Sequence, residues 1–311
     1  MAATTPSVLA GLPEATTAVA AAVAPAVVRI GRHGGRGCGI VVAEGAVLTN
    51  AHNLRDRTTE VTFADDRAEQ GRALAADPDG DLVVLAVDTG DIAPVTWADE
   101  LPGLGGIVFG VSRARGGERV TFGTVSGVAR SFRGPRGRRV RGSLEHTAPL
   151  ARGSSGSPLV DERGRLVGLN TARLGDGFYL ALPADADLRQ RVDALLAGES
   201  PRRLVLGVGL AGADVATNLR ASVGLPPRTG LLVRAVAEGS PAGAAGIQVG
   251  DLLTAAGERE LATVDDLHDA LDGARATSTL ALHVVRGSEE LDVTVSFDAP
   301  DEEAEEPGDD A

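Results

Sequence analysis

The sequence is poor in the residues that mark several classes of protein. Cys38 is the only cysteine among 311 residues, so an internal disulfide is excluded, and an oxidising compartment is neither required nor ruled out. Cysteine and histidine form no cluster with metal-ligand spacing, and we expect neither a metal nor another cofactor. Aromatic residues make up only 3% of the chain against 41 glycines, which favours aliphatic cores joined by many turns.

Long apolar runs are also missing. No stretch approaches the roughly eighteen consecutive apolar residues that a membrane-spanning helix needs. The Ala-rich segment 1–26 has no basic start, and polar residues such as Thr5, Glu14 and Thr17 interrupt it, so it does not read as a signal peptide. We therefore expect a soluble, cytoplasmic protein without a membrane partner. The alternative is an exported protein whose leader has been removed.

Negative charge exceeds positive charge, with a formal net charge of −13. This balance argues against a general nucleic-acid binder, although part of it lies between Asp298 and Asp310. This acidic stretch contains Pro300 and Pro307 and no large apolar residue, so we expect residues 299–311 to form a disordered tail.

The pattern of residues divides the rest of the chain into two units. Over 1–198, short β-rich runs alternate with glycine-containing turns, which indicates a mainly β unit. The runs are 27–30, 40–43, 82–87, 120–128 and 166–170. A helical stripe over 184–196, stopped by Gly198, closes this unit. Residues 199–203 are polar, contain a proline and are expected to be a linker.

The second unit, 204–298, is expected to be a small α+β domain with two short helices. Its predicted strands are 205–210, 231–236, 252–256, 280–286 and 291–297. One predicted helix covers 264–271, with Thr263 as its N-cap. The other is short, with Ser240 as its cap, Pro241 at its first position and Gly246 after its end.

Three segments of the first unit carry a catalytic pattern. An apolar strand ends at His52 in VLTNAH, an acidic turn delivers Asp81 to a strand in DPDGDLVVL, and Ser155 lies in GSSGSPL. Each segment alone is commonly structural, because a histidine after a strand or an aspartate in a turn usually has no catalytic role. Together, in the order His, Asp, Ser, they are far more specific.

The chemistry explains the residue types. A serine hydroxyl needs a base to accept its proton, and an imidazole whose other nitrogen is held by a buried carboxylate supplies one. Glycines beside the serine let the backbone aim N–H groups at a developing oxyanion. We predict a triad of His52, Asp81 and Ser155, with the amides of Gly153 and Ser155 as the oxyanion hole.

These motifs resemble those of the HtrA (DegP-like) serine protease family. The matching residues are TNAH at 49–52, DLVVL at 81–85, GSSG at 153–156 and the strand PAVVRI at 25–30. The resemblance implies a trypsin-like double β-barrel that cleaves unfolded or damaged polypeptides after small aliphatic residues. It also implies a homotrimer, but relatives trimerise through N-terminal aromatic residues, and none here precedes Phe63.

Two positions depart from the family pattern. Ser154 replaces the usual asparagine before the nucleophile, and Ser157 replaces a glycine after it. Neither change removes a backbone donor, so Ser155 stays the predicted nucleophile. The departures motivate an alternative, a catalytically silent peptide-binding scaffold or holdase chaperone.

The second unit resembles a bacterial PDZ domain through EGSPAGAAGIQVGDLL at 238–253. PDZ domains bind peptide C-termini as an added strand at a sheet edge. The resemblance implies that the edge is 205–210 and that the amides of Leu206, Gly207 and Val208 receive the carboxylate. Arg202 and Arg203 either attract that carboxylate or are solvated linker charges.

A basic segment, 130–141, contains six arginines. By position it resembles the sensor loop through which HtrA proteases respond to their PDZ domain. It is either a solvated loop or a segment that docks on the PDZ domain or the acidic tail. Nucleic-acid binding is the least favoured alternative, because Phe132 is the only aromatic residue near these arginines.

Overall fold

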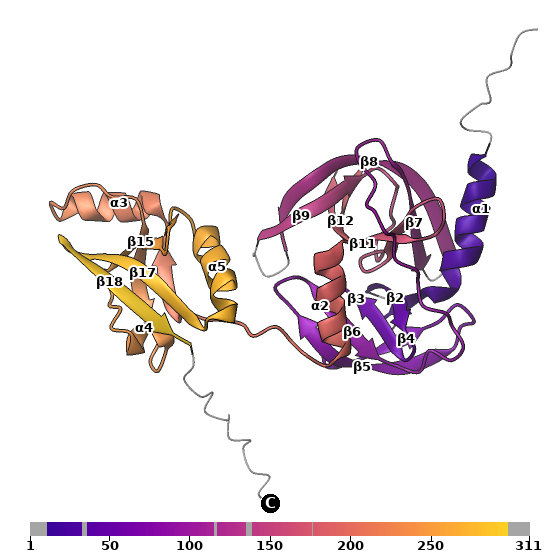
Figure 1. The fold of residues 1–311 in the computed structure, drawn as a ribbon, viewed down its shortest axis with the longest axis horizontal. Coiled ribbons are helices and arrows are strands. Elements are labelled where there is room, and N and C mark those ends of the chain that lie inside the picture. The colour runs from indigo at the N-terminus through magenta and orange to yellow at the C-terminus, as the bar shows by residue number, and fades with distance from the viewer. Residues whose placement is uncertain (1–10, 33–35, 115–116, 135–138, 176, 298–311) are drawn as a thin grey trace, which may run out of the picture. The chain divides into compact units, whose positions relative to one another are not determined.

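A computed structural model describes residues 11–32, 36–114, 117–134, 139–175 and 177–297 (Figure 1). The chain forms two compact units, 1–201 and 202–311, and each has its own hydrophobic core. The division falls within the expected linker, 199–203. The expected acidic tail lies outside the described residues.

The first six strands of the chain close into a barrel in the order β1-β2-β3-β6-β5-β4. Their bounds are β1 Val27–Ile30, β2 Gly37–Ala43, β3 Ala46–Thr49, β4 Thr58–Thr62, β5 Ala68–Asp77 and β6 Leu82–Ala86. Strand β6 is an unbroken apolar run because both of its faces are buried.

Six further strands close a second barrel, in the order β10-β11-β12-β9-β8-β7. Their bounds are β7 Ile107–Ala114, β8 Gly117–Arg133, β9 Arg139–His146, β10 Pro158–Val160, β11 Leu166–Gly175 and β12 Phe178–Pro183. The expected double β-barrel is thus confirmed, although β8 and β11 are longer than the apolar runs that predicted them.

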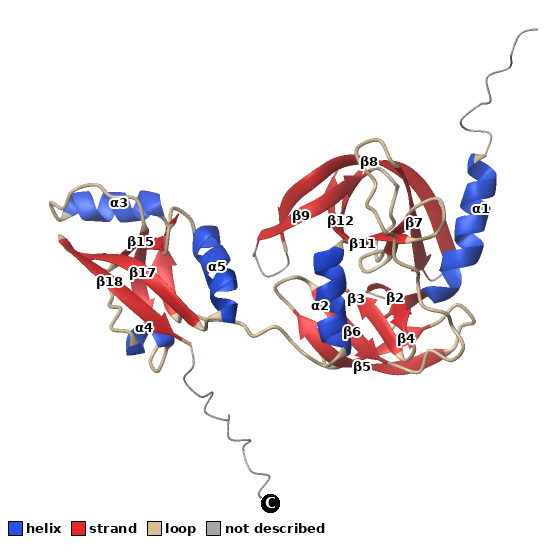
Figure 2. Cartoon of the chain, viewed as in Figure 1, coloured by secondary structure: helices blue, strands red, loops and turns tan. Residues whose placement is uncertain are grey.

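Two α-helices accompany the barrel strands of the first unit (Figure 2). Helix α2, Ala186–Leu196, was expected, and the Asp185 side chain caps it by accepting from the Leu188 N–H. Helix α1, Leu12–Val23, was not expected, because threonines interrupt its apolar stripe. Its buried Val19 and Val23 pack in one cluster with residues of the second barrel, such as Phe109. The short helix η1, Ala24–Ala26, joins α1 to β1.

The second unit contains a six-stranded antiparallel sheet, in the order β13-β14-β15-β17-β18 with β16 paired to β15. The strands are β13 Val208–Ala211, β14 Leu231–Val236, β15 Leu252–Ala256, β16 Arg259–Glu260, β17 Thr279–Arg286 and β18 Glu289–Ser296. Strand β13 begins later than predicted, because the side chains of Leu204 and Leu206 enter the core from a loop.

Both predicted helices of the second unit are confirmed. Helix α4, Pro241–Ala244, is capped by Ser240, and helix α5, Val264–Gly273, begins with a capping box between Thr263 and Asp266. A third helix, α3 at Ala213–Ser222, was missed, because an arginine, Arg220, is one of its two buried residues. The last short helix is η3, Ala274–Ala276. No helix in the described ranges is long and apolar enough to cross a membrane.

Candidate active site

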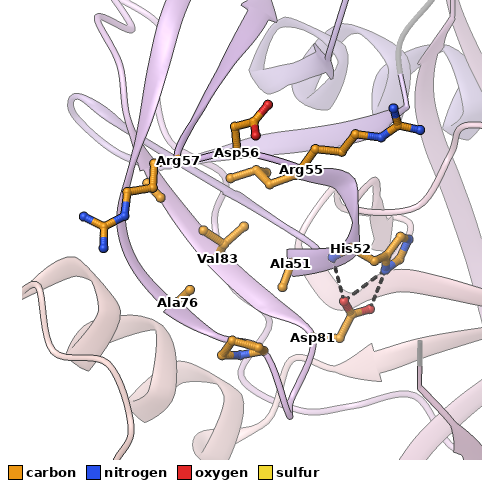
Figure 3. A pocket seen from close by; sticks show the side chains of 11 residues that line it. Ala51, His52, Arg55, Asp56, Arg57, Ala76, Asp81 and Val83 are labelled. Carbon is orange, nitrogen blue, oxygen red and sulfur yellow. Dashed lines mark hydrogen bonds and ion pairs between the residues drawn. The ribbon is translucent and has the colours of Figure 1, made fainter. Parts of the chain in front are cut away.

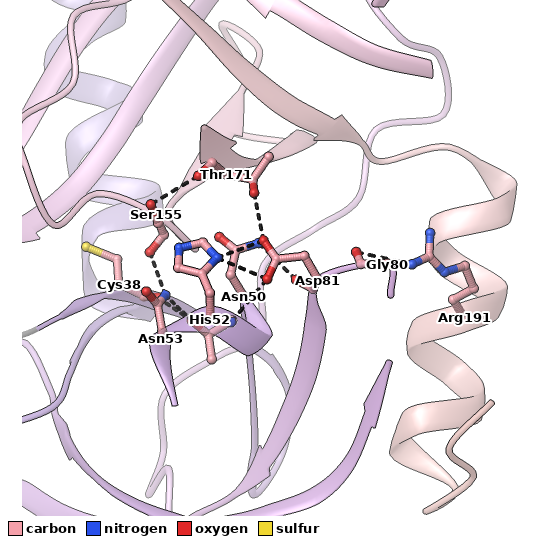
Figure 4. Close-up of polar contacts among 10 residues, drawn as sticks. Cys38, Asn50, His52, Asn53, Gly80, Asp81, Ser155, Thr171 and Arg191 are labelled. Atoms are coloured by element: carbon pink, nitrogen blue, oxygen red, sulfur yellow. Dashed lines mark hydrogen bonds and ion pairs between the residues drawn. The ribbon is translucent and has the colours of Figure 1, made fainter. Parts of the chain in front are cut away.

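The first barrel brings two of the predicted catalytic residues into contact. His52 lies in the short helix η2, Ala51–Asn53, directly after β3, and Asp81 directly precedes β6. Strands β3 and β6 are paired, so their ends lie side by side. The His52 Nδ1 is 2.8 Å from one Asp81 carboxylate oxygen and 3.0 Å from the other. This contact leaves Nε2 on the opposite side of the ring, which Figure 4 shows between Asp81 and Ser155.

The Asp81 carboxylate is 3% exposed, so its charge needs partners inside the protein. The main-chain N–H of His52 donates to it at 3.1 Å, and the Thr171 hydroxyl donates to it at 2.8 Å. The Asn50 side chain donates to the Asp81 carbonyl at 3.0 Å. These contacts, from both barrels, hold the carboxylate in one orientation against the imidazole.

The turn before Asp81 is anchored to helix α2. The Arg191 guanidinium donates to the Asp77 carboxylate at 2.7 Å and to the Gly80 carbonyl at 3.3 Å. A Cβ on Gly80 would lie 1.7 Å from an Arg191 nitrogen, so a larger residue there would displace the Arg191 guanidinium. Asp81 itself has φ +57, a left-handed conformation that is uncommon for a non-glycine residue. Such strain persists where the surroundings enforce it, often at functional sites.

The loop that carries Ser155 belongs to the second barrel, before β10, and is fastened to the first. The Ser155 carbonyl accepts from the Cys38 N–H at 2.8 Å and from the Asn53 side chain at 2.9 Å. Gly156 has φ +84, and its N–H donates to the Asn170 carbonyl at 2.7 Å. Hydrogen bonds therefore hold both the C=O and the N–H group of the peptide bond between Ser155 and Gly156.

The predicted oxyanion donors are free. Within the described residues, the N–H groups of Gly153 and Ser155 donate to no acceptor. The Ser155 hydroxyl is not bonded to His52 but donates to the Thr171 carbonyl at 3.2 Å. The hydroxyl must therefore turn about its Cα–Cβ bond before the imidazole can accept its proton.

The unusual Ser157 is explained by a buried polar network. Its hydroxyl accepts from the Asn170 side chain at 3.0 Å, and Asn170 in turn is 2.9 Å from Nε2 of His146. The His146 ring is fully buried and stacks on Tyr179. Burial lowers the pKa of His146 to about 4. The sequence offered no partner for His146, because Asn170 and Tyr179 come from neighbouring strands.

A cavity of about 220 Å³ lies beside Ser155. One side of the cavity is formed by the segment that ends in Ser155, and the other side by residues 170–173 of β11 and by Tyr179. The lining residues are Leu150, Ala151, Arg152, Gly153, Ser154, Ser155, Asn170, Thr171, Ala172, Arg173 and Tyr179.

A larger cavity, of about 560 Å³, lies on the first barrel (Figure 3). His52 and Asp81 form one edge, Arg57 lies at the other, and Ala76 and Val83 form part of its apolar floor. Its lining includes no residue of the Ser155 loop.

Within the described ranges, no group of three or more His, Cys, Asp or Glu side chains could hold a metal ion.

The predicted peptide site lies at the edge strand of the second unit. Strand β13 ends the sheet order, and Val208 is its first residue. The N–H groups of Leu206 and Gly207 have no acceptor among the described residues. Gly207 has φ +78, and its carbonyl accepts from Ala237. Arg202 bonds to the Ser278 hydroxyl and the Phe297 carbonyl, so its guanidinium has partners within the unit.

The predicted sensor loop forms the end of the hairpin between β8 and β9. Arg130 makes an ion pair with Glu145 at 3.3 Å, and Ser126 donates to the same carboxylate at 3.0 Å. Residues 135–138 lie outside the described residues.

Comparison with known proteins matches both units to known domain families. Residues 37–169 match the trypsin-like peptidase domain, and residues 205–297 match the PDZ domain. The putative serine protease HhoB of Synechocystis sp. is 29% identical over 270 residues, which is 82% of this chain and 64% of that protein. The probable periplasmic serine endoprotease DegP-like of Brucella suis is 30% identical over 281 residues, or 84% and 52%.

Solved structures agree on the fold. The HtrA-type protease AlgW with a decapeptide has a TM-score of 0.72 at 22% identity, covering 90% of this chain and 97% of that one. A serine endoprotease from Yersinia pestis has a TM-score of 0.68 at 23% identity, covering 90% and 96%. The chain spans about half to two thirds of the length of the curated relatives that it matches. The chain therefore combines a trypsin-like peptidase domain with a single PDZ domain, as in the HtrA-type and DegP-like serine proteases that it resembles.

Proposed function

We propose that this protein is a serine endopeptidase that cleaves unfolded or damaged polypeptides, with peptide binding at its PDZ domain as the regulator. The observation that carries the proposal is the contact, at 2.8 Å, between His52 and the buried carboxylate of Asp81, beside a serine loop in which the N–H groups of Gly153 and Ser155 have no acceptor. A histidine held in this way on one nitrogen is arranged to act as a base on the other.

In the proposed mechanism, Ser155 turns from the Thr171 carbonyl toward His52 Nε2. Its oxygen attacks the substrate carbonyl carbon while the imidazole takes its proton, and Asp81 stabilises the imidazolium. The amides of Gly153 and Ser155 receive the developing oxyanion, where losing one donor typically costs about a hundred- to a thousandfold in rate. The imidazolium then protonates the leaving amine, and water releases the acyl group by the same route.

A fluorophosphonate probe tests the nucleophile. We expect it to label the wild type and to leave Ser155→Ala unlabelled, with cleavage of unfolded casein lost in parallel. Asp81→Asn should fold but lose about four orders of magnitude in kcat, because the imidazole tautomer is no longer fixed. A folded wild type that is unlabelled, even with unfolded substrate and PDZ peptide present, would contradict the proposal.

The second candidate function is a silent peptide-binding scaffold or holdase. One observation favours it, namely the Ser155 hydroxyl bonded to Thr171 at 3.2 Å and not to the histidine. One assay distinguishes the two candidate functions. It compares how well the wild type and Ser155→Ala suppress the aggregation of an unfolded protein. Equal suppression without any probe labelling would favour the scaffold.

The PDZ proposal rests on the free edge of β13 and the unused amides of Leu206 and Gly207. We expect peptides with a free C-terminus to bind and their C-terminal amides to bind at least tenfold more weakly, because the carboxylate receives the charge-assisted hydrogen bonds. Fluorescence anisotropy measures both affinities. Equal affinities would place peptide binding elsewhere.

A further inference from the structure

The cavity beside Ser155 is lined by two arginines, Arg152 and Arg173, and by no acidic residue. Within the described residues neither arginine makes an ion pair with a carboxylate. Other arginines of the chain do, including Arg165, Arg191 and Arg286. Both positive charges at this cavity therefore lack a carboxylate partner among the described residues.

The position of the cavity relative to the nucleophile identifies what would enter it. The carbonyl carbon under attack must reach the Ser155 hydroxyl while its oxygen faces the Gly153 and Ser155 amides. The side chain of that same substrate residue starts one bond from the carbonyl. It therefore falls into the space between Gly153–Ser155 and the Thr171–Arg173 segment of β11, which line the cavity.

Arg173 is held in place at this cavity. Its Nη2 donates to the Leu150 carbonyl at 2.9 Å and to the Tyr179 hydroxyl at 2.9 Å. Its guanidinium lies 5.1 Å from the centre of the Tyr179 ring. A guanidinium has five N–H donors, and the bonds of Arg173 use only those on Nη2. Since Tyr179 accepts from Arg173, its own O–H is also left to donate.

This arrangement of donors matches a carboxylate. The donors of Arg173, the charge of Arg152 and the Tyr179 hydroxyl can all serve an anion. The cavity, of about 220 Å³, has several times the roughly 30 Å³ that one water occupies in the liquid, so it has room for a medium-sized side chain. A small aliphatic side chain, which the family resemblance implies, would desolvate the guanidinium without pairing it.

We propose that the protein cleaves after acidic residues, with Arg173 as the residue that determines this specificity and Arg152 in support. The proposal rests on the proposed endopeptidase function and names its substrate class. Glutamate and aspartate are the two acidic side chains available in a polypeptide. A hydrogen-bonded pair of ionised groups commonly changes binding affinity by about 10- to 100-fold. We expect the preference for acidic over aliphatic residues to have that size.

Quenched fluorescent peptides that differ only in the residue before the cleaved bond provide the test. That residue would be Glu, Asp, Gln, Val or Lys, and kcat/KM is measured for each. We expect the wild type to prefer Glu or Asp over Val and Lys by at least tenfold. Arg173→Gln should remove most of this preference by lowering kcat/KM for the Glu and Asp peptides, and Arg173→Glu should favour the Lys peptide. Arg119→Gln, an exposed arginine outside the cavity, is the matched control and should behave as the wild type.

Fluorophosphonate labelling of every variant tests the proposed endopeptidase activity separately from the proposed acidic specificity. A labelled wild type that cleaves best after Val, or after Gln equally with Glu, would overturn the acidic specificity and leave the endopeptidase intact. So would a Glu preference that Arg173→Glu does not change. A folded but unlabelled wild type would overturn both.

Discussion

Thr171 contacts the catalytic residues at two points: its carbonyl accepts from the Ser155 hydroxyl at 3.2 Å, and its hydroxyl donates to Asp81 at 2.8 Å. One residue of β11 thus links the nucleophile loop of the second barrel to the carboxylate of the first. Turning the serine toward His52 requires only a change between staggered side-chain conformations. A substrate N–H that bonds to the Thr171 carbonyl would remove the acceptor that holds the hydroxyl away from the histidine.

The Thr171 hydroxyl should matter for rate more than for binding. We predict that Thr171→Val lowers kcat by about 10- to 100-fold, because a hydrogen bond to a charged group contributes about 1.5–3 kcal/mol. KM should change little, since the carbonyl is retained. Steady-state kinetics on a fluorescent peptide measures both constants. Thr171→Ser keeps the hydroxyl and should restore most of the rate, and a Ser variant as slow as the Val variant would contradict this role.

Two glycines of the nucleophile loop provide a matched pair for stability. Gly153 and Gly156 have nearly equal φ values, +83 and +84, so alanine at either position costs about 1–2 kcal/mol in backbone energy. A Cβ on Gly153 would meet nothing within 4 Å, whereas one on Gly156 would lie 2.2 Å from the Cys38 carbonyl oxygen. We therefore predict that Gly156→Ala lowers the free energy of unfolding by about 1–3 kcal/mol more than Gly153→Ala.

Urea denaturation of the two variants measures this difference. The two glycines are three residues apart in the same loop, so differences in the unfolded state should be small. Equal losses of stability would mean that the backbone at Cys38 shifts to make room for the added Cβ. The packing between the two barrels would then be less rigid than the structure indicates.

Local signals predicted much of this fold from sequence. The caps of α4 and α5 were read correctly because Ser240 and Thr263 bond to groups within three residues. The bounds of β14 and β15 were likewise predicted, because apolar runs end at turns. The N-terminal helix α1 was missed, since its buried stripe consists of few residues, with Val19 and Val23 the fully buried ones.

The surroundings of the predicted catalytic residues could not be read in this way. Thr171 lies 90 residues from Asp81, and Arg191 lies 114 residues from Asp77, so only the folded barrels and helix α2 bring them together. Arg173 lies in none of the sequence motifs that predicted the site. Its importance comes from the cavity that β11 and Tyr179 form, and sequence spacing does not reveal that cavity.

Cys38 should be inert in the folded protein. Its thiol is fully buried, between the Arg113 and Gly153 carbonyls, and burial raises its pKa to about 11. The reactive thiolate is therefore scarce at pH 8. We predict no reaction with a thiol-specific disulfide reagent at pH 8 until guanidinium unfolds the protein, when one thiol per chain should react. Rapid reaction of the native protein would show that the loop containing Gly153 opens readily.

His146 should make the stability of the first unit depend on pH. Its Nε2 bonds to Asn170, whereas its Nδ1 is buried without a partner among the described residues. A second proton would therefore have no acceptor, which agrees with the lowering of its pKa from 6.5 to about 4. Between these two values the unfolded chain binds a proton that the folded protein does not. Stability from this group is complete above pH 6.5 and is lost as the pH falls toward 4.

The gap in pKa corresponds to roughly 3 kcal/mol, because each unit is worth about 1.4 kcal/mol. We predict that the free energy of unfolding of the wild type falls by about this much more, between pH 7 and pH 4, than that of His146→Gln. Glutamine can still donate to Asn170 but does not titrate, and all other ionisable groups are common to both proteins. Urea denaturation at a series of pH values gives the difference directly. Parallel curves would mean that His146 becomes protonated in the folded protein, and that the network from His146 through Asn170 to Ser157 can rearrange to accept the charge.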